Sequence, residues 1–259
     1  KDFYYNVGFT FSHARNEILD MDEPDAKTGY RKQEGHPINQ YFGLICDGFV
    51  TQADLDNPNF PKSTYGNVQV GDLKYRDMNG DGFIDDRDET FIGYSDIPEN
   101  TYALTLGAQW KGIGFSVMFQ GVDHVSRFYD AEAMFAFVNG GKVKEHHLGR
   151  WNPAMSEEYN LANATYPLLH YDSYGNHNQR QNSFFLKNGA FLRLKNIELS
   201  YSLPQSWIKK AAMKECRIYV NASNLVTWDH LGGLTDPESN GSNRYPIMKT
   251  VNFGVNIQF

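Results

Sequence analysis

The last ten residues of the chain, 250–259, read TVNFGVNIQF and alternate strictly between apolar and polar positions. The apolar members share one parity: Val251, Phe253, Val255, Ile257 and Phe259. Because successive side chains of a β-strand point to opposite faces, the stretch predicts a strand with one apolar and one polar face. A strand of about 9–11 residues crosses a bilayer when tilted, and a transmembrane barrel turns its apolar face to lipid and its polar face to a wet lumen. We therefore expect a membrane-spanning barrel strand, which needs a paired strand on each edge.

Similar alternation recurs in five other stretches, which are 2–12, 101–110, 113–121, 191–203 and 216–226. A short turn around Lys111 and Gly112 joins two of them, and a tight link that contains a glycine is a hairpin signal. The stretch 191–203 is less regular, because Arg193 and Lys195 share parity with apolar residues; a bulge near Asn196 would account for the break. The sequence thus predicts an all-β chain of antiparallel strands.

The connections between these strands are very unequal in length. Long loops span 13–100, 122–190 and 227–249, whereas the links at Gly112 and at 204–215 are short. Short turns on one side and long loops on the other are typical of outer-membrane barrels. The only good helix candidate, SWIKKAAMKE at 206–215, lies on the short-turn side. Cys46 falls in a long loop and Cys216 at the opposite rim, so both are predicted to be free thiols, because a disulfide needs Cα atoms within about 7 Å.

Composition excludes several classes of function. The formal net charge is −7 over 259 residues, whereas nucleic-acid binding favours clustered Lys and Arg. The sequence has no run of 18 apolar residues, so a transmembrane helix is excluded. Aromatic residues make up 15% of the chain, which fits the girdles of a barrel at the two membrane interfaces. The opening residues, KDFYYNVGFTF, lie inside a β pattern without signal-peptide features, which we interpret as a fragment or as a mature chain missing its front.

No catalytic pattern stands out in the sequence. It contains no G-x-S-x-G nucleophile elbow and no glycine-rich phosphate loop, so we expect no enzyme. His146 and His147 are adjacent, and because adjacent strand residues point to opposite faces, we interpret them as part of a solvated loop. Six aromatic residues of the long loops could stack on sugars, although packing of the loops is their more common role: Tyr166, Tyr171, Tyr174, Phe184, Trp228 and Tyr245.

One motif carries a specific chemistry. Residues 77–88 read DMNGDGFIDDRD and place the predicted ligands at alternate loop positions: Asp77, Asn79, Asp81, the Phe83 carbonyl, Asp85 and Asp88. This is the spacing of a calcium loop of EF-hand type, with Gly82 at the sharp bend. Asp88 replaces the usual Glu and the flanks look like strands, so we expect a structural Ca²⁺ or Mg²⁺ clasp and not a sensor. The alternative is an acidic loop in which Asn-Gly and Asp-Gly are ordinary turns.

Eight stretches of the sequence carry a family pattern. They are SHARNEILDMDEPD at 12–25, GHPINQYFGLICDGF at 35–49, GDLKYRDMNGDGFIDDRDETFIGY at 71–94, WKGIGFSVMFQGV at 110–122, HLGRWNP at 147–153, FLRLKNIELSYSLP at 191–204, YVNASNLVTW at 219–228 and FGVNIQF at 253–259. These stretches resemble the C-terminal part of SusC-type, TonB-dependent outer-membrane transporters. Together they cover nearly the whole chain.

The resemblance implies that residues 1–259 are the last portion of a barrel of about 22 strands with an internal plug. It also implies a SusD-like surface lipoprotein as partner, and TonB as the source of power for import. The sequence departs from a complete family member, since it shows no plug domain and no TonB box, and its few strands cannot close a barrel. We therefore expect the remainder of the same transporter, its plug and N-terminal strands, to be a further partner.

Two functions follow from these observations. The first is the C-terminal barrel segment of an outer-membrane importer of oligosaccharides or oligopeptides, with lipid around the wall and the long loops on the cell surface. The alternative is a secreted, calcium-stabilised β-sandwich that binds glycans. Apolar rows that face outward support the importer, whereas apolar rows packed against each other support the sandwich.

Overall fold

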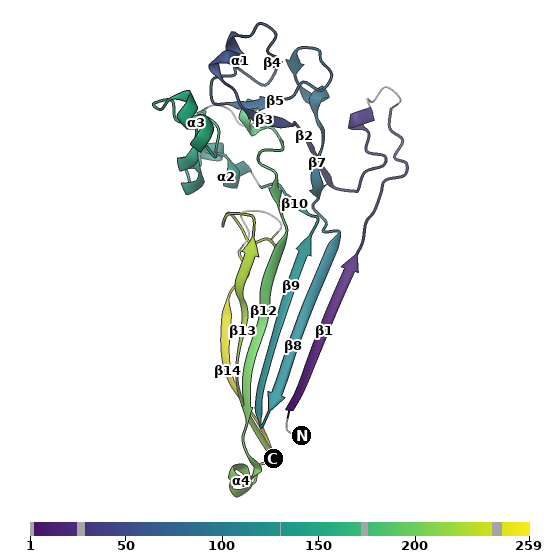
Figure 1. The fold of residues 1–259 in the computed structure, drawn as a ribbon, viewed down its shortest axis with the longest axis vertical. Helices are drawn as coiled ribbons and strands as arrows, with labels where there is room; N and C mark the ends of the chain where they lie inside the picture. The colour runs from purple at the N-terminus through teal and green to yellow at the C-terminus, as the bar shows by residue number, and fades with distance from the viewer. Residues whose placement is uncertain (1–2, 25–28, 130, 172–175, 240–244) are drawn as a thin grey trace.

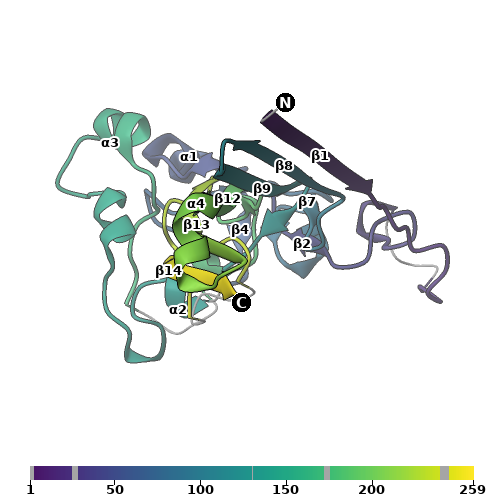
Figure 2. The same ribbon diagram turned by 90° about the horizontal axis from the view of Figure 1, so that it is seen from below.

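The computed structural model describes residues 3–24, 29–129, 131–171, 176–239 and 245–259. These residues form a six-stranded antiparallel sheet with packed loops at one end and two short turns at the other (Figure 1). The strands follow in the order β1 (Phe3–His13), β8 (Asn100–Trp110), β9 (Ile113–Asp123), β12 (Phe191–Ser202), β13 (Glu215–Asp229) and β14 (Thr250–Gln258). Seen from below, the sheet is an open wall and not a closed barrel (Figure 2). All six predicted strands are confirmed.

The hairpin between β8 and β9 turns within two residues. Trp110 pairs with Ile113, and the intervening Lys111 and Gly112 have φ values of 47° and 86°. Two successive positive φ values match the twist of a two-residue hairpin, so the predicted hairpin is confirmed. The Gly112 carbonyl also accepts a hydrogen bond of 2.8 Å from the Ser202 backbone N–H, which ties this turn to the end of β12.

The predicted bulge in β12 is also confirmed. Against β9, the register shift between Leu194 and Asn196 leaves Lys195 as an extra residue of β12. Against β13, the single Lys195 lies opposite two residues, Asn224 and Leu225. On the N-terminal side of the bulge, Arg193 pairs with Gln120 of β9, whose side chain belongs to the polar face. The bulge therefore turns Arg193 towards the polar face, whereas unbroken alternation would turn it towards the apolar one.

The three long loops contain short elements of their own. Four two-stranded sheets pair β2 (Gln40–Gly43) with β7 (Thr90–Ser95), β3 (Cys46–Phe49) with β5 (Leu73–Tyr75), β4 (Lys62–Ser63) with β6 (Phe83–Ile84), and β10 (Ser126–Arg127) with β11 (Lys187–Asn188). The helices are α1 (Gln52–Asp56), α2 (Ala131–Met134) and α3 (Glu157–Asn163), with 3-10 turns η1 (Gly29–Arg31), η2 (Asp86–Asp88), η3 (Val138–Gly140), η4 (Glu145–Gly149) and η5 (His177–Gln179).

All three loops share one hydrophobic core, and we call this assembly the crown. Leu44 and Leu73 come from the first loop, Phe185 from the second and Leu231 from the third, and all four are fully buried in the same cluster. The long loops therefore fold as a packed unit on top of the wall (Figure 1).

Helices were the least accurate part of the prediction. The stretch 206–215 yields only α4 (Gln205–Ile208) and the 3-10 turn η6 (Lys209–Ala211), and the expectation that it is the sole helix is wrong. The crown helices are one or two turns long, and α1 and α3 begin at side-chain caps, such as the capping box of Thr51 and Asp54 at α1. Such short helices lack an amphipathic period that a sequence could reveal.

Two further expectations concern single features. Among the described residues, no helix has the length and apolar character needed to span a membrane. Cys46 lies in the crown and Cys216 at the short-turn end of β13, and both are free thiols, as predicted.

Candidate functional site

One face of the sheet is apolar across all six strands. A single row of cross-strand partners shows this register: Val7, Leu106, Val117, Ile197, Ala222 and Val251. Much of the face is open, since Val7 is 65% exposed and Phe253 is 84% exposed. A contiguous apolar surface of this width marks contact with a membrane or a partner.

The exposed apolar rows decide between the two predicted architectures. A β-sandwich buries one face of each sheet against a second sheet. Within the described ranges, every sheet other than the wall has two strands and lies in the crown. The alternative of a β-sandwich therefore does not fit the described residues, and the predicted antiparallel sheet is confirmed.

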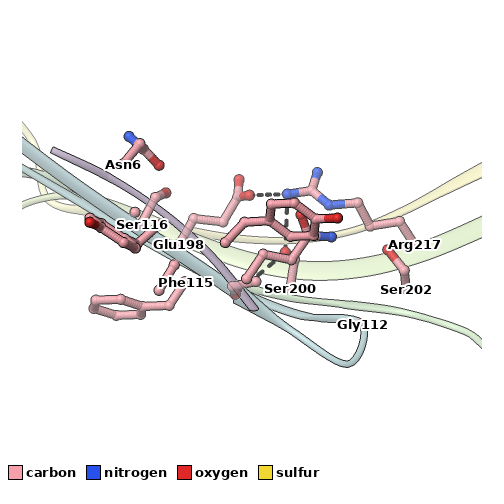
Figure 3. A pocket seen from close by; sticks show the side chains of 14 residues that line it. Asn6, Gly112, Phe115, Ser116, Glu198, Ser200, Ser202 and Arg217 are labelled. Atoms are coloured by element: carbon pink, nitrogen blue, oxygen red, sulfur yellow. Dashed lines mark hydrogen bonds and ion pairs between the residues drawn. The ribbon is translucent and has the colours of Figure 1, made fainter. Parts of the chain in front are cut away.

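The opposite face is polar and carries a groove of about 350 Å³ near the short-turn end (Figure 3). Arg217 of β13 forms an ion pair with Glu198 of β12, and its guanidinium lies 3.1 Å from Ser200 Oγ. Asn6 extends over Gly107 of the next strand, where any Cβ atom would stand 2.2 Å from Asn6 Oδ1. The polar face thus offers hydrogen-bonding groups to whatever fills this side of the wall.

A buried ion-pair cluster joins the polar face to the third loop. Arg193 is 1% exposed, and its guanidinium lies 2.8 Å from Asp236 and 2.8 Å from Glu238, while Lys195 lies 3.2 Å from Glu238. We call these four residues the clasp. It fastens the third loop to the bulge of β12. The break in alternation at Arg193 and Lys195 was the signal in the sequence, but it did not identify Asp236 and Glu238 as the partners.

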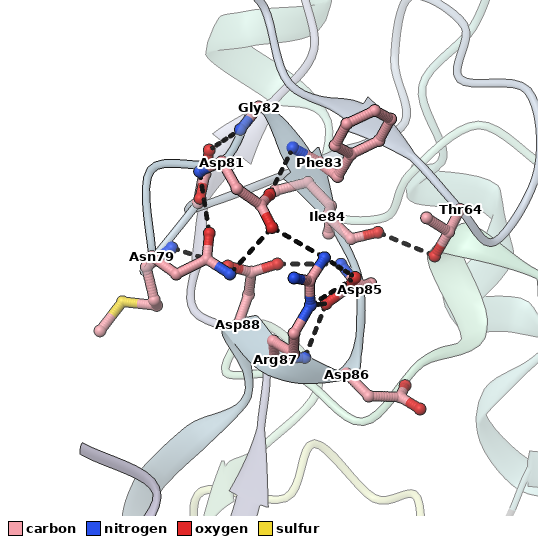
Figure 4. A network of polar contacts seen from close by, with 12 residues as sticks. Thr64, Asn79, Asp81, Gly82, Phe83, Ile84, Asp85, Asp86, Arg87 and Asp88 are labelled. Carbon is pink, nitrogen blue, oxygen red and sulfur yellow. Dashed lines mark hydrogen bonds and ion pairs between the residues drawn. The ribbon is translucent and has the colours of Figure 1, made fainter. Parts of the chain in front are cut away.

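The predicted cation loop folds as a tight turn held by its own hydrogen bonds (Figure 4). Asp77 accepts from the backbone N–H groups of Gly80 and Gly82, at 2.7 and 2.8 Å. Asn79 and Asp81 accept from backbone N–H groups two residues further on, and Asp88 accepts from those of Met78 and Asp85. Phe83 begins the short strand β6. The predicted strand-like flanks are confirmed as β5 and β7.

Arg87 occupies the centre of this loop. Its guanidinium lies 2.7 Å from Asp81 and 2.7 Å from Asp85, and its hydrogen bonds hold the pKa of Asp85 below the usual range. Across the described part of the chain, no three His, Cys, Asp or Glu side chains form a group that could hold a metal ion. The donors are all oxygens, as Ca²⁺ and Mg²⁺ require, but two of the six are bonded to Arg87.

The prediction that His146 and His147 lie in a solvated loop is wrong. His147 is fully buried, and both His146 and His147 bring Nε2 close to the Met134 carbonyl, at 3.1 and 3.0 Å. The Tyr166 hydroxyl donates to the same oxygen. They fall on the 3-10 turn η4, where adjacent side chains do not alternate between two faces as on a strand.

The crown aromatics divide into two groups. Tyr166 is buried in the crown core and Phe184 packs against it, so these two hold the loops together. Tyr171, Trp228 and Tyr245 are exposed. Tyr174 lies outside the described residues.

Comparisons with known proteins agree with this geometry. No protein-family model matches the chain. The chain is 25% identical to TonB-dependent receptor P3 and 26% identical to TonB-dependent receptor P26, both of Formosa agariphila, over 100% of its own length and 27% of each relative. It is 25% identical to TonB-dependent receptor SusC of Bacteroides thetaiotaomicron, over 100% of the chain and 25% of SusC. This chain matches a segment of SusC-type TonB-dependent receptors.

Solved structures share the fold of this chain. The structure of the RagAB peptide transporter superposes with a TM-score of 0.70 at 22% identity, over 100% of this chain and 28% of that one. The RagAB peptide importer in its open-open state gives a TM-score of 0.67 at 23% identity. This chain spans about a quarter of the length of the curated relatives it matches.

Proposed function

We propose that this chain forms part of the wall and the surface crown of a TonB-dependent outer-membrane importer of oligomeric nutrients. The observation that carries the proposal is the apolar face, which runs in register across six strands with a polar face behind it. That arrangement suits a wall with lipid on one side and a wet lumen on the other. The chain performs no bond chemistry in this function; it encloses a path and shapes its entrance.

The wall requires further strands. Among the described residues β1 is paired only with β8, and β14 only with β13, so each has one open edge. An unpaired backbone edge in hydrocarbon costs several kcal/mol for each polar group. The remaining strands and the plug of the same receptor are the partners that this requirement favours. The crown then faces the cell exterior, where a SusD-like lipoprotein meets it, and TonB acts from the short-turn side.

The membrane position is tested by a pair of substitutions in the complete receptor. Val255 is 59% exposed on the apolar face, and Asn256 is its neighbour on the polar face. Val255→Arg should lower the stability of the barrel by about 2–4 kcal/mol if it lies near the membrane midplane. Asn256→Arg should have little effect. Equal losses from the two variants, or recovery of the receptor in the aqueous fraction without detergent, would rule out the proposal.

The substrate is an oligosaccharide or an oligopeptide. The RagAB neighbours are described as peptide importers, which favours peptides. Binding of defined oligopeptides and oligosaccharides to the complete receptor, measured by calorimetry, separates the two classes. Tyr171 and Tyr245, the most exposed crown aromatics among those named above, are the first positions to replace by Ala.

We also propose that residues 77–88 bind a structural Ca²⁺ or Mg²⁺. The proposal is supported by the spacing of Asp77, Asn79, Asp81, the Phe83 carbonyl, Asp85 and Asp88, and by their oxygen chemistry. Arg87 would have to release its carboxylates to the ion. Calcium should protect loop 13–100 from proteolysis, and the Asp77→Ala/Asp81→Ala variant should lose that protection. The control is Asp86→Asn, which removes a carboxylate of the same loop that does not belong to the predicted ligands. Equal cleavage of the parent protein with calcium and with chelator would contradict the proposal.

A further inference from the structure

An apolar groove of about 660 Å³ lies on the apolar face near the short-turn end of the wall. Its main lining side chains come from four strands: Ile113, Leu199, Tyr201, Ile218, Val220 and Phe253. They are cross-strand neighbours, since Ile113 pairs with Tyr201 and Tyr201 pairs with Ile218. The volume is that of a small-molecule site, and the lining provides no charged group.

A lysine stands at the short-turn mouth of this groove. Lys111 Nζ lies 5.1 Å from the centre of the Trp110 ring. Trp110 belongs to the apolar face, because it pairs with Ile113, which lines the groove. The ammonium of Lys111 is therefore held on the groove side of the wall by a cation–π contact.

A second basic turn lies beside the first. The hydrogen bond from the Ser202 N–H to the Gly112 carbonyl brings the β8–β9 turn against the end of β12. The chain then continues into α4 and η6, where Trp207, Lys209 and Lys210 are all exposed. Trp and Lys together are typical of a membrane interface, with the ring at headgroup level and the ammonium in water.

The charge of this rim has one sign. Residues 111–112 and 204–214 contain lysines and no acidic residue. Lys214 already donates to the Phe259 carbonyl, at 2.8 Å. Glu215 shares the parity of Arg217, so it belongs to the polar face and points away from the groove. An apolar groove with lysines at its mouth is complementary to a ligand with an anionic head and an aliphatic tail.

We propose that the groove and the two turns bind an anionic phospholipid of the membrane leaflet at the short-turn end. Lys111, with Lys209 and Lys210, contacts the headgroup phosphate, and one acyl chain lies between Leu199 and Phe253. The inference rests on the proposed function, because the groove meets lipid only if the apolar face lies in a membrane. It adds a selective site to a surface that otherwise contacts lipid without preference.

The test uses the complete receptor, stripped of lipid in detergent and then mixed with phosphatidylglycerol or phosphatidylethanolamine of the same acyl chains. Native mass spectrometry counts the retained lipid. The parent protein should retain phosphatidylglycerol preferentially. Each lysine near an anionic lipid contributes about a fivefold preference, so Lys111→Gln/Lys209→Gln should reduce it about 20-fold. Lys142→Gln/Lys249→Gln changes the net charge equally at the other end of the molecule and should leave the preference unchanged.

A third variant tests the groove itself. Ile218→Trp fills the groove and should lower retention of phosphatidylglycerol while the rim lysines stay in place. Equal retention of the two lipids by the parent protein, or equal losses in the rim and control variants, would overturn the site. Correct folding of each variant is checked by its heat-modifiable migration on a gel. A receptor that folds in detergent but shows no lipid preference refutes the lipid site alone, whereas a receptor soluble without detergent refutes the proposed function.

Discussion

His147 should resist protonation, and acid should therefore weaken the crown around it. Its Nδ1 accepts a hydrogen bond of 2.8 Å from the Lys144 N–H, so Nε2 must carry the proton and donate to the Met134 carbonyl. Both ring nitrogens are thus used by the neutral imidazole. A second proton would place two donors against each other at Nδ1, inside a fully buried site.

The size of the effect follows from the pKa. Burial lowers the pKa of His147 from 6.5 to about 4. Above pH 6.5 the histidine is neutral in both the native and the unfolded state, so stability does not depend on its titration. Between pH 6.5 and 4 the unfolded state takes up a proton that the native state refuses, and stability falls by about 3 kcal/mol. Below pH 4 the native state is protonated too, and the loss levels off.

Hydrogen exchange of the segment 131–150 in the complete receptor, corrected for intrinsic rates, measures this loss. Protection should fall between pH 6.5 and 4 in the parent protein. His147→Gln supplies an acceptor and a donor without a titration, so its protection should stay constant over that range. His146→Gln removes the partly exposed neighbour and should keep the acid step. An unchanged step in His147→Gln would refute the assignment.

Three further predictions concern single side chains. Arg193→Met should lower the free energy of unfolding by about 3–5 kcal/mol, because it leaves two carboxylates of the clasp without their buried partner; a loss below about 1 kcal/mol in chemical denaturation would contradict this. Arg87→Gln should tighten binding of calcium to the loop, measured by calorimetry, because the guanidinium competes for Asp81; weaker binding would show that Arg87 supports the site. Burial raises the pKa of the Cys46 thiol to about 11. Its alkylation at pH 7.5 should therefore be about 100-fold slower than that of free cysteine, and comparable rates would place the thiol in water.

The wall could be read from the sequence because its signal is local. Alternation with a period of two residues depends only on which side chains belong to the apolar face and which to the polar face, so each strand shows it independently of the others. The bulge was predictable for the same reason, since Arg193 and Lys195 disturb the alternation. The clasp was not, because the loop residues Asp236 and Glu238 reach β12 only through the folded third loop.

The contacts within the crown could not be predicted from local sequence patterns. The burial of His147 depends on contacts with Met134 and Tyr166, which lie elsewhere in the second loop, and no periodicity of the sequence predicts these contacts. In the loop 77–88 the spacing of acidic residues is the same whether Arg87 or a metal ion neutralises them. The spacing of the acidic residues identifies the oxygen donors. Whether Arg87 or a metal ion neutralises them depends on where the side chains lie in three dimensions.

The extra residue in β12 has a consequence for insertions and deletions. Lys195 separates two runs of β12 in which the apolar residues fall on opposite parity, so deleting it alone would restore regular alternation within β12 and keep both faces where they are. Asn224 and Leu225 of β13 would then have no residue opposite them. Removing one residue elsewhere in the strand, such as Ile197, would exchange the two faces on one side of that point and turn the Arg193 guanidinium towards the apolar face. Related chains should therefore accept a length change in β12 at the bulge, and the loops of the crown should absorb the others.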